Sequence, residues 1–399
     1  MKVRASLFLM GCVPGVVATA CQAAPPPAPE ASVRDSAGIR IVEYETTPEI
    51  PSPFTFSSQP IYRYGAELED YAFRSVWRGV LLSDGSAAVA DAFNREVVLL
   101  EPDGTFRGLL AGPGDGPGEI DMIGGLLPAG HDTLLLEDIG HGRLTLFAGG
   151  EAVREVDTRF LNRGPRVRGL DAEGQALMTS GRYRPDFREP WLQGRMVRFD
   201  MDAGVVDTIA AYDWVPSSPD EGPTNPFMPG GLVTVAQGSF VYLRSDTPEV
   251  VWRSSDGTTR QIARWRPAPV YPDEDDWRLY TTSLRTQLRR ANPQIQSEAE
   301  FEEMMERSLG RYELAPDQPL PLVSEIFGDR GGRVWLGHWA ADAQLNGVTR
   351  YSILAPDGSW LGDIEAPSRV RILDVSGQRV LGAFRDELGV ESVVVYELP

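Results

Sequence analysis

The chain has 399 residues, 42% of them hydrophobic, and 57 acidic against 38 basic side chains give a formal net charge of −19 at pH 7. This acidic excess excludes a protein that binds nucleic acid nonspecifically through its phosphates. The length is compatible with one large repeat-type β domain or with two smaller domains.

The first twenty residues have the layout of a secretory signal peptide. Lys2 and Arg4 precede an apolar stretch that ends at Ala20, just before Cys21. The stretch is too short, and too rich in small residues at its end, to serve as a transmembrane helix. We therefore expect residues 1–20 to be removed on export.

Ala18-Thr19-Ala20-Cys21 resembles the lipobox of bacterial lipoproteins. This resemblance implies that the signal is cut before Cys21 and that the Cys21 thiol is then acylated. Cys12 is a competing site, but it would leave an apolar core shorter than the usual minimum of about seven residues. A plain secreted protein remains the alternative. Residues 21–35 include a Pro/Ala-rich run and predict a semi-rigid tether between the lipid and the folded part.

An internal repeat runs through residues 36–399. A glycine precedes a short apolar segment six times, with steps of 45, 44, 64, 94 and 45 residues, at Gly85, Gly130, Gly174, Gly238, Gly332 and Gly377. Three of the five steps agree within one residue, and a period in the forties is typical of β-propeller blades. The two long steps require insertions.

Each unit reads as two hairpins, because strand-like runs flank a turn such as Asp103-Gly104. Four strands per unit and six units predict an all-β, six-bladed β-propeller with antiparallel blades. The last unit stops after its third strand. Residues 38–44 alternate apolar and polar side chains, so we predict that this N-terminal strand completes the sixth blade and closes the ring.

The first unit matches the pattern Gly-x-x-x-Val-x-Asp-x-x-Asn-x-x-Val from Gly85 to Val97 and resembles an NHL-type repeat. The whole chain is similar to six-bladed propeller lipoproteins related to NHL and TolB-like proteins. The resemblance implies the fold, whereas function does not follow from it. In such blades Asp91 and Asn94 brace a turn through backbone amides, and ligand binding is the alternative role.

Residues 273–312, between the fourth and fifth units, change to helical periodicity. The first helix is indicated by acidic residues at its start and by apolar residues at helical spacing, namely Trp277, Tyr280, Leu284 and Leu288. Ser297 begins a capping box for a second helix, whose apolar residues are Phe301, Met304, Met305 and Leu309. We expect a helical hairpin that overhangs one face of the propeller.

Candidate ligand-binding residues are expected on that same face, at the channel mouth and in the loops around it: Arg78, Arg168, Arg371, Asp138, His141, Arg182, His338 and Trp339. The three arginines recur near the start of inner strands and could grip a carboxylate or phosphate bidentately. The alternative is that they pair with carboxylates of the channel or rim, such as Glu325, Asp374 and Asp342.

Propeller enzymes offer a second hypothesis, because six-bladed relatives include lactonases that hold a divalent metal with Glu, Asn and Asp. Asp91, Asn94 and Asp138 are the candidate ligands for a divalent metal such as calcium in a site of this kind. The three histidines cannot form a zinc site, since His131 is expected on the opposite face from the other two. Nucleophile motifs such as Gly-x-Ser-x-Gly are absent from the sequence.

We therefore expect a monomeric, non-enzymatic binding module without a cofactor, exported and anchored to a membrane of the cell envelope through Cys21. Its partner would be a protein, a peptide or a small anionic ligand, bound at the helix-covered face. A metal-dependent hydrolase or lyase of the lactonase kind is the alternative.

Overall fold

The computed structural model describes residues 30–65, 71–130, 132–161, 164–183, 190–217, 224–343 and 347–399. The predicted signal peptide, Cys21 and His131 lie outside these ranges, as does the side chain of Arg182. No helix of the described residues is long and apolar enough to cross a membrane.

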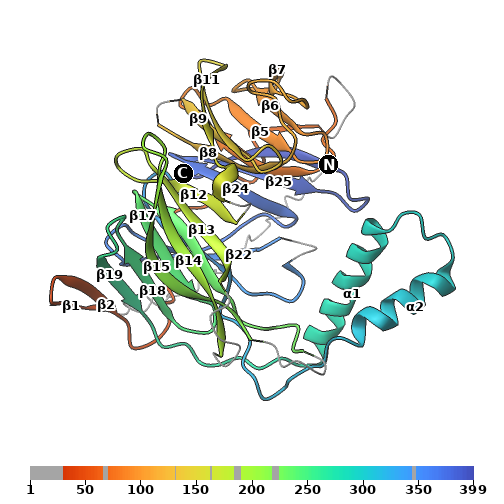
Figure 1. Cartoon of the computed structure of the whole chain (residues 1–399). Helices are drawn as coiled ribbons and strands as arrows, with labels where there is room; N and C mark the ends of the chain where they lie inside the picture. The colour runs from red at the N-terminus through yellow and green to blue at the C-terminus, as the bar shows by residue number, and fades with distance from the viewer. Residues whose placement is uncertain are drawn as a thin grey trace, which may run out of the picture.

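The described strands form six sheets arranged around a ring (Figure 1). The first three sheets each run outward through four consecutive antiparallel strands: β4 (Val76–Leu81), β5 (Ala87–Asp91), β6 (Glu96–Leu100) and β7 (Phe106–Ala111); β8 (Ile123–Pro128), β9 (Thr133–Asp138), β10 (Arg143–Ala148) and β11 (Glu151–Asp157); and β12 (Pro165–Leu170), β13 (Ala176–Tyr183), β14 (Trp191–Asp200) and β15 (Val205–Pro216). A short 3-10 helix (Arg159–Leu161) links the second and third sheets.

The remaining blades repeat this design: β16 (Gly231–Ala236), β17 (Ser239–Arg244), β18 (Glu249–Arg253) and β19 (Thr259–Arg264); β20 (Val323–Gly328), β21 (Val334–His338), β22 (Arg350–Leu354) and β23 (Trp360–Glu365); and β24 (Val370–Ser376), β25 (Arg379–Arg385), β26 (Glu391–Glu397) and β3 (Tyr62–Tyr64). The inner strands contact one another in turn from β4 through β8, β12 and β16 to β20, and β24 packs against β4. The chain is a six-bladed β-propeller, as predicted.

The ring is closed by an N-terminal strand, but the predicted strand was wrong. β3 pairs antiparallel with β26, with Tyr62 opposite Val395. Residues 38–44 instead contain β2 (Ile39–Glu43), which pairs parallel with β19, while β1 (Ser32–Ser36) folds back on β2. The fourth sheet thereby gains two strands. Alternation marked residues 38–44 as a strand, but alternation carries no information about which sheet edge a strand joins.

The hairpin turns follow from local side-chain chemistry. Gly104 has a φ of 88°, a left-handed conformation that glycine adopts without strain. The Asp103 carboxylate accepts hydrogen bonds of 2.9 Å from the Thr105 amide and 2.8 Å from its hydroxyl. Asp357-Gly358-Ser359 repeats the arrangement in the fifth blade. These Asp-Gly turns are recognisable in the sequence because every partner lies within two residues.

The core lies between neighbouring blades, where large side chains of adjoining sheets interdigitate. Trp335, Tyr351, Phe199 and Phe240 have no exposed surface. Burying a side chain of this size stabilises the fold by roughly 1.5–3 kcal/mol. Separate apolar clusters therefore fill the seams between neighbouring blades in the described part of the chain.

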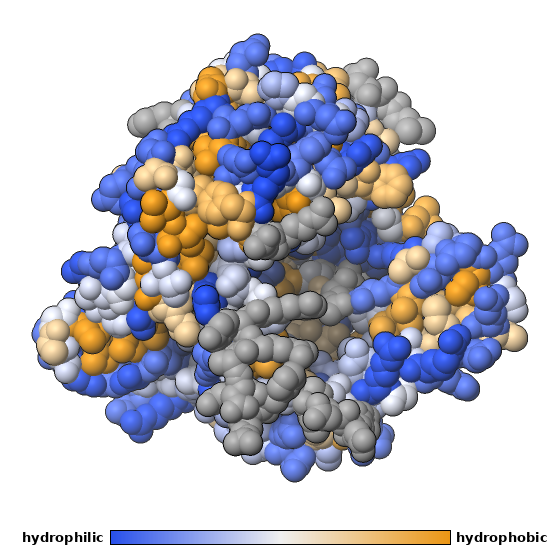
Figure 2. Space-filling view, in the orientation of Figure 1, coloured by the Kyte–Doolittle hydropathy of each residue, from blue (hydrophilic) through white to orange (hydrophobic). Residues whose placement is uncertain are grey.

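The helical insertion is also confirmed. α1 (Glu274–Ala291) and α2 (Glu298–Leu309) project from the ring (Figure 1). Asp273 caps α1 in a capping box, and the Ser297 hydroxyl accepts from the Glu300 amide at the start of α2. Phe301 of α2 is fully buried, with the Arg289 guanidinium 3.4 Å from its ring centroid. Apolar atoms gather between the helices, whereas their outer rim is largely hydrophilic (Figure 2).

Candidate functional site

The inner strands enclose a central channel with a volume of about 670 Å³. Arg78 on β4, Arg168 on β12 and Arg371 on β24 all line it, so the structure brings together the three arginines that the sequence singled out. The cavity extends from them to the β-hairpin turns on the face opposite the helical hairpin, at Gly130, Gly174 and Gly238. The cavity therefore extends away from the channel mouth that the sequence predicted on the face of the helical hairpin.

None of the three arginines forms an ion pair within 4.0 Å with a carboxylate of the described residues. Arg168 Nε donates to the Thr179 hydroxyl at 2.8 Å, and Arg78 Nη1 donates to the Trp77 carbonyl at 3.2 Å. Arg371 donates to the carbonyls of Val76 and Trp77. Their partners are thus uncharged, and each guanidinium has five N–H donors to offer.

Burial lowers the pKa values of all three arginines. Burial lowers the pKa of Arg78 to about 10, and the positive charges of Arg371 and Arg168 add to this effect. All three remain protonated at neutral pH, so the channel concentrates positive charge inside a protein of strongly negative net charge.

The carboxylates proposed as their alternative partners are engaged elsewhere. Glu325 accepts a hydrogen bond from the Tyr351 hydroxyl, and burial raises its pKa. Asp374 accepts from the Leu81 amide at 2.8 Å and pairs with Arg330 at 3.2 Å. These two carboxyls temper the positive potential of the channel without neutralising any of the three arginines directly.

Glu137 is a buried carboxyl that sequence reasoning missed. Its side chain lies on β9, only 5% of the residue is exposed, and its Oε2 has no hydrogen-bond partner. Burial raises its pKa to about 7, against the lowering influence of Arg166, Arg168 and Arg78. The sequence does carry a signal for a buried carboxyl here: Glu137 directly follows the apolar run Leu134-Leu135-Leu136, in a strand that is buried on both faces.

Asp91 braces a turn through backbone amides. It is fully buried and accepts hydrogen bonds from the backbone amides of Arg74, Ser75, Phe93 and Asn94, at 2.9 to 3.2 Å. The Asn94 side-chain amide adds a further bond of 3.0 Å to the second carboxylate oxygen. Both oxygens are therefore occupied by the protein itself.

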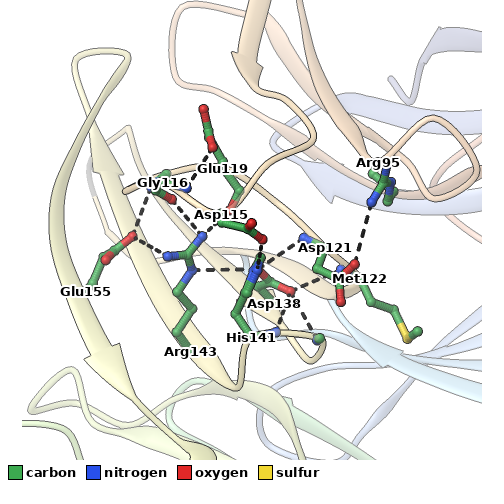
Figure 3. A network of polar contacts seen from close by, with 12 residues as sticks. Arg95, Asp115, Gly116, Glu119, Asp121, Met122, Asp138, His141, Arg143 and Glu155 are labelled. Atoms are coloured by element: carbon green, nitrogen blue, oxygen red, sulfur yellow. Dashed lines mark hydrogen bonds and ion pairs between the residues drawn. The ribbon is translucent and has the colours of Figure 1, made fainter.

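Asp138 holds the corresponding turn of the second blade within a polar network (Figure 3). It accepts from the amides of Met122 and Gly140, and its Oδ2 lies 2.6 Å from His141 Nδ1. His141 Nε2 reaches Asp115 Oδ1 at 2.9 Å. The Asp138 and Asp115 carboxylates raise the pKa of His141, which favours the imidazolium form. His141 thereby connects the segment between β7 and β8, which carries Asp115, to the second blade, which carries Asp138.

No group of three or more His, Cys, Asp or Glu in the described ranges is placed to hold a metal ion. Asp91 and Asn94 lie in the first blade and Asp138 in the second. The Asp91 and Asp138 carboxylates already accept hydrogen bonds from several backbone amides. The calcium site remains an untested prediction. Arg182 lies in β13, with its side chain outside the described part.

His338 and Trp339 lie apart from the channel arginines and from the polar network around His141. They line a smaller pocket of about 240 Å³ at the seam between the fourth and fifth blades. The Trp339 ring packs edge-on against Phe227, with centroids 5.1 Å apart. The predicted ligand-binding residues therefore divide into the channel arginines, the His141 network and this seam pocket.

Comparison with solved structures agrees with the architecture. A candidate exported protein from Bacteroides fragilis superposes with a TM-score of 0.50 at 10% identity, covering 90% of this chain and 99% of that chain. At this identity the likeness shows the fold alone. A DUF4221 family member from Bacteroides vulgatus gives 0.48 at 10% identity (87% and 98% covered), and regucalcin, a calcium-binding protein from Agrobacterium tumefaciens, gives 0.40 at 12% (86% and 95%). No family model and no curated protein matches the sequence.

Proposed function

We propose that this chain is an exported, lipid-anchored propeller that binds a small anionic ligand in its central channel without catalysing a reaction. The observation that carries the proposal is that Arg78, Arg168 and Arg371 line one cavity, while no carboxylate of the described residues lies within 4.0 Å of their guanidinium nitrogens. An anion with two or more carboxylate or phosphate groups would satisfy several guanidinium donors at once.

Charge and geometry both favour this ligand class. Three positive charges repel one another inside the protein, and an anion placed between them lowers the total electrostatic energy of the group. Arginine is suited to the task because its planar fork matches the oxygens of carboxylate and phosphate. The channel volume of about 670 Å³ lies within the range usual for small-molecule sites, roughly 300–1,000 Å³.

The binding site is tested with citrate and inorganic phosphate as probes, by isothermal titration calorimetry at low ionic strength. Arg168→Gln is expected to weaken binding of the preferred probe by about tenfold or more, because it removes a charge-assisted contact. Arg260→Gln is the matched control, since Arg260 is exposed on β19 and does not line the channel. The proposal would be overturned if neither citrate nor phosphate bound, or if Arg168→Gln and Arg260→Gln lost the same amount of affinity.

The anchor is tested separately. The proposal rests here on Ala18-Thr19-Ala20-Cys21 and the Pro/Ala-rich tether that follows. Expressed in a bacterial host with its own leader, the chain is expected to partition into the detergent phase of a Triton X-114 extraction. Cys21→Ala should move it to the aqueous phase, because a protein without the acyl chains loses its membrane affinity. A Cys12→Ala variant that still partitions into detergent would support Cys21, and loss of partitioning in that variant would favour Cys12.

A further inference from the structure

We propose that the pocket between the fourth and fifth blades binds a small, uncharged aromatic molecule that carries a hydrogen-bond donor. This site is separate from the channel, shares none of its three arginines and takes a ligand of different chemistry. It is formed by the start of β20, the end of β21 and the two linkers that connect the helical hairpin to the propeller.

The walls of the pocket are apolar and largely aromatic. Trp265 and Trp360 are almost completely buried, and their rings meet edge-to-face with centroids 5.5 Å apart. Trp339 lines the same space, and the aliphatic lining is Val270, Leu320, Leu322, Val323 and Leu336. A planar aromatic ligand would be stabilised most by such walls, because each aromatic pair contributes about 0.5–1.5 kcal/mol beyond the hydrophobic gain from the buried area.

One end of the pocket is polar. His338 Nε2 lies 2.7 Å from the Ser352 hydroxyl, which donates its proton to Asp363 Oδ1 at 2.8 Å. The Ser352 oxygen must therefore accept from Nε2–H, and in a neutral imidazole the other nitrogen, Nδ1, is then an acceptor. No described residue makes a hydrogen bond to Nδ1. A ligand N–H or O–H would supply the missing donor.

The charges around His338 exclude an anionic ligand. Asp363 lies behind Ser352 and is itself paired with Arg350 at 2.6 Å. Burial lowers the pKa of His338, which favours the neutral ring. An anion would face a neutral acceptor and an apolar wall, and it would lose its hydration without a charged partner. An uncharged donor meets no such cost.

The linkers that hold the hairpin form one wall of the site. The Leu320 amide donates to the Val270 carbonyl at 2.7 Å and so clamps the two linkers together. Trp339 contacts Phe227, and Phe227 contacts Tyr280 of α1 with centroids 5.7 Å apart. The base of the hairpin therefore contributes to the shape of the pocket.

Indole and benzofuran test the proposal, because the two bicyclic molecules have nearly the same shape and only indole has an N–H donor. We expect indole to bind the purified chain in a calorimetric titration about tenfold more tightly than benzofuran. His338→Phe should remove this preference by weakening indole about tenfold while leaving benzofuran nearly unchanged. Trp339→Ala should weaken both ligands.

His141→Phe is the matched control, since the His141 ring lies in the second blade and does not line this pocket. Arg168→Gln should also leave indole binding unchanged, which separates this proposal from anion binding in the channel. Circular dichroism melts verify that each variant is folded. Equal affinity for indole and benzofuran, or no binding of indole up to its solubility limit, would overturn the inference.

Discussion

Replacing Asp91 with alanine is expected to lower the free energy of unfolding by about 3 to 5 kcal/mol. The carboxylate is completely buried and accepts backbone amides from both sides of its turn, including those of Arg74 and Ser75 before β4 and of Phe93 after β5. Alanine would leave these amides without an acceptor in a place that water does not reach, and each lost partner costs roughly 1–3 kcal/mol.

Urea unfolding followed by circular dichroism measures this effect. Asp91→Asn should cost less, about 1 to 2 kcal/mol, because its carbonyl oxygen keeps part of the acceptor capacity. Asp103→Ala, in an exposed hairpin turn, is the control and should cost about 1 kcal/mol or less. A wild-type melting temperature that rises with calcium, and no longer does so in Asp91→Asn, would instead identify Asp91 as a metal ligand.

Glu137→Gln is expected to stabilise the chain at pH 8 by up to about 3 kcal/mol and to have little effect at pH 4. Burial raises the pKa of Glu137 to about 7, whereas an unfolded chain leaves a glutamate near 4.5. Between these values the folded state holds a proton that the unfolded state has lost. Stability from this group is therefore complete below pH 4.5 and is lost as the pH rises toward 7.

Parallel urea titrations of wild type and variant at pH 4, 6 and 8 would test this pH dependence. The difference between the two proteins should grow with pH, because glutamine cannot ionise. Glu151→Gln provides the control, since Glu151 is exposed on β11 in the same blade. A constant difference across the pH range would mean that the Glu137 carboxyl is not the titrating group.

Local chemistry allowed much of the fold to be predicted from the sequence. The glycine repeat, the Asp-Gly turns and the capping signals at Asp273 and Ser297 each involve partners only a few residues apart. Asp91 belongs only partly to this class, because the Phe93 and Asn94 amides are local partners whereas those of Arg74 and Ser75 lie on the other side of the first hairpin. Such features form in the same way wherever the blade is placed in the ring.

The candidate site was only partly predictable. The arginines that recur near the start of inner strands lie around one channel, because every blade presents its inner strand to the same axis. Whether those arginines would meet carboxylates depended on the side chains of other blades. Glu325 and Asp374 turned out to bond to Tyr351 and Arg330 instead.

The sequence by itself determined the number of blades, the turns within them and the helical insertion, because these depend on periodicity and on contacts within a few residues. Only the tertiary structure decided which N-terminal strand closes the ring, toward which face the channel extends and how the linkers enclose the pocket beside His338. These features join segments far apart in the chain, such as Tyr62 with Val395. An alternating pattern is equally compatible with several sheet edges, and the choice rests on which edge the rest of the fold leaves open.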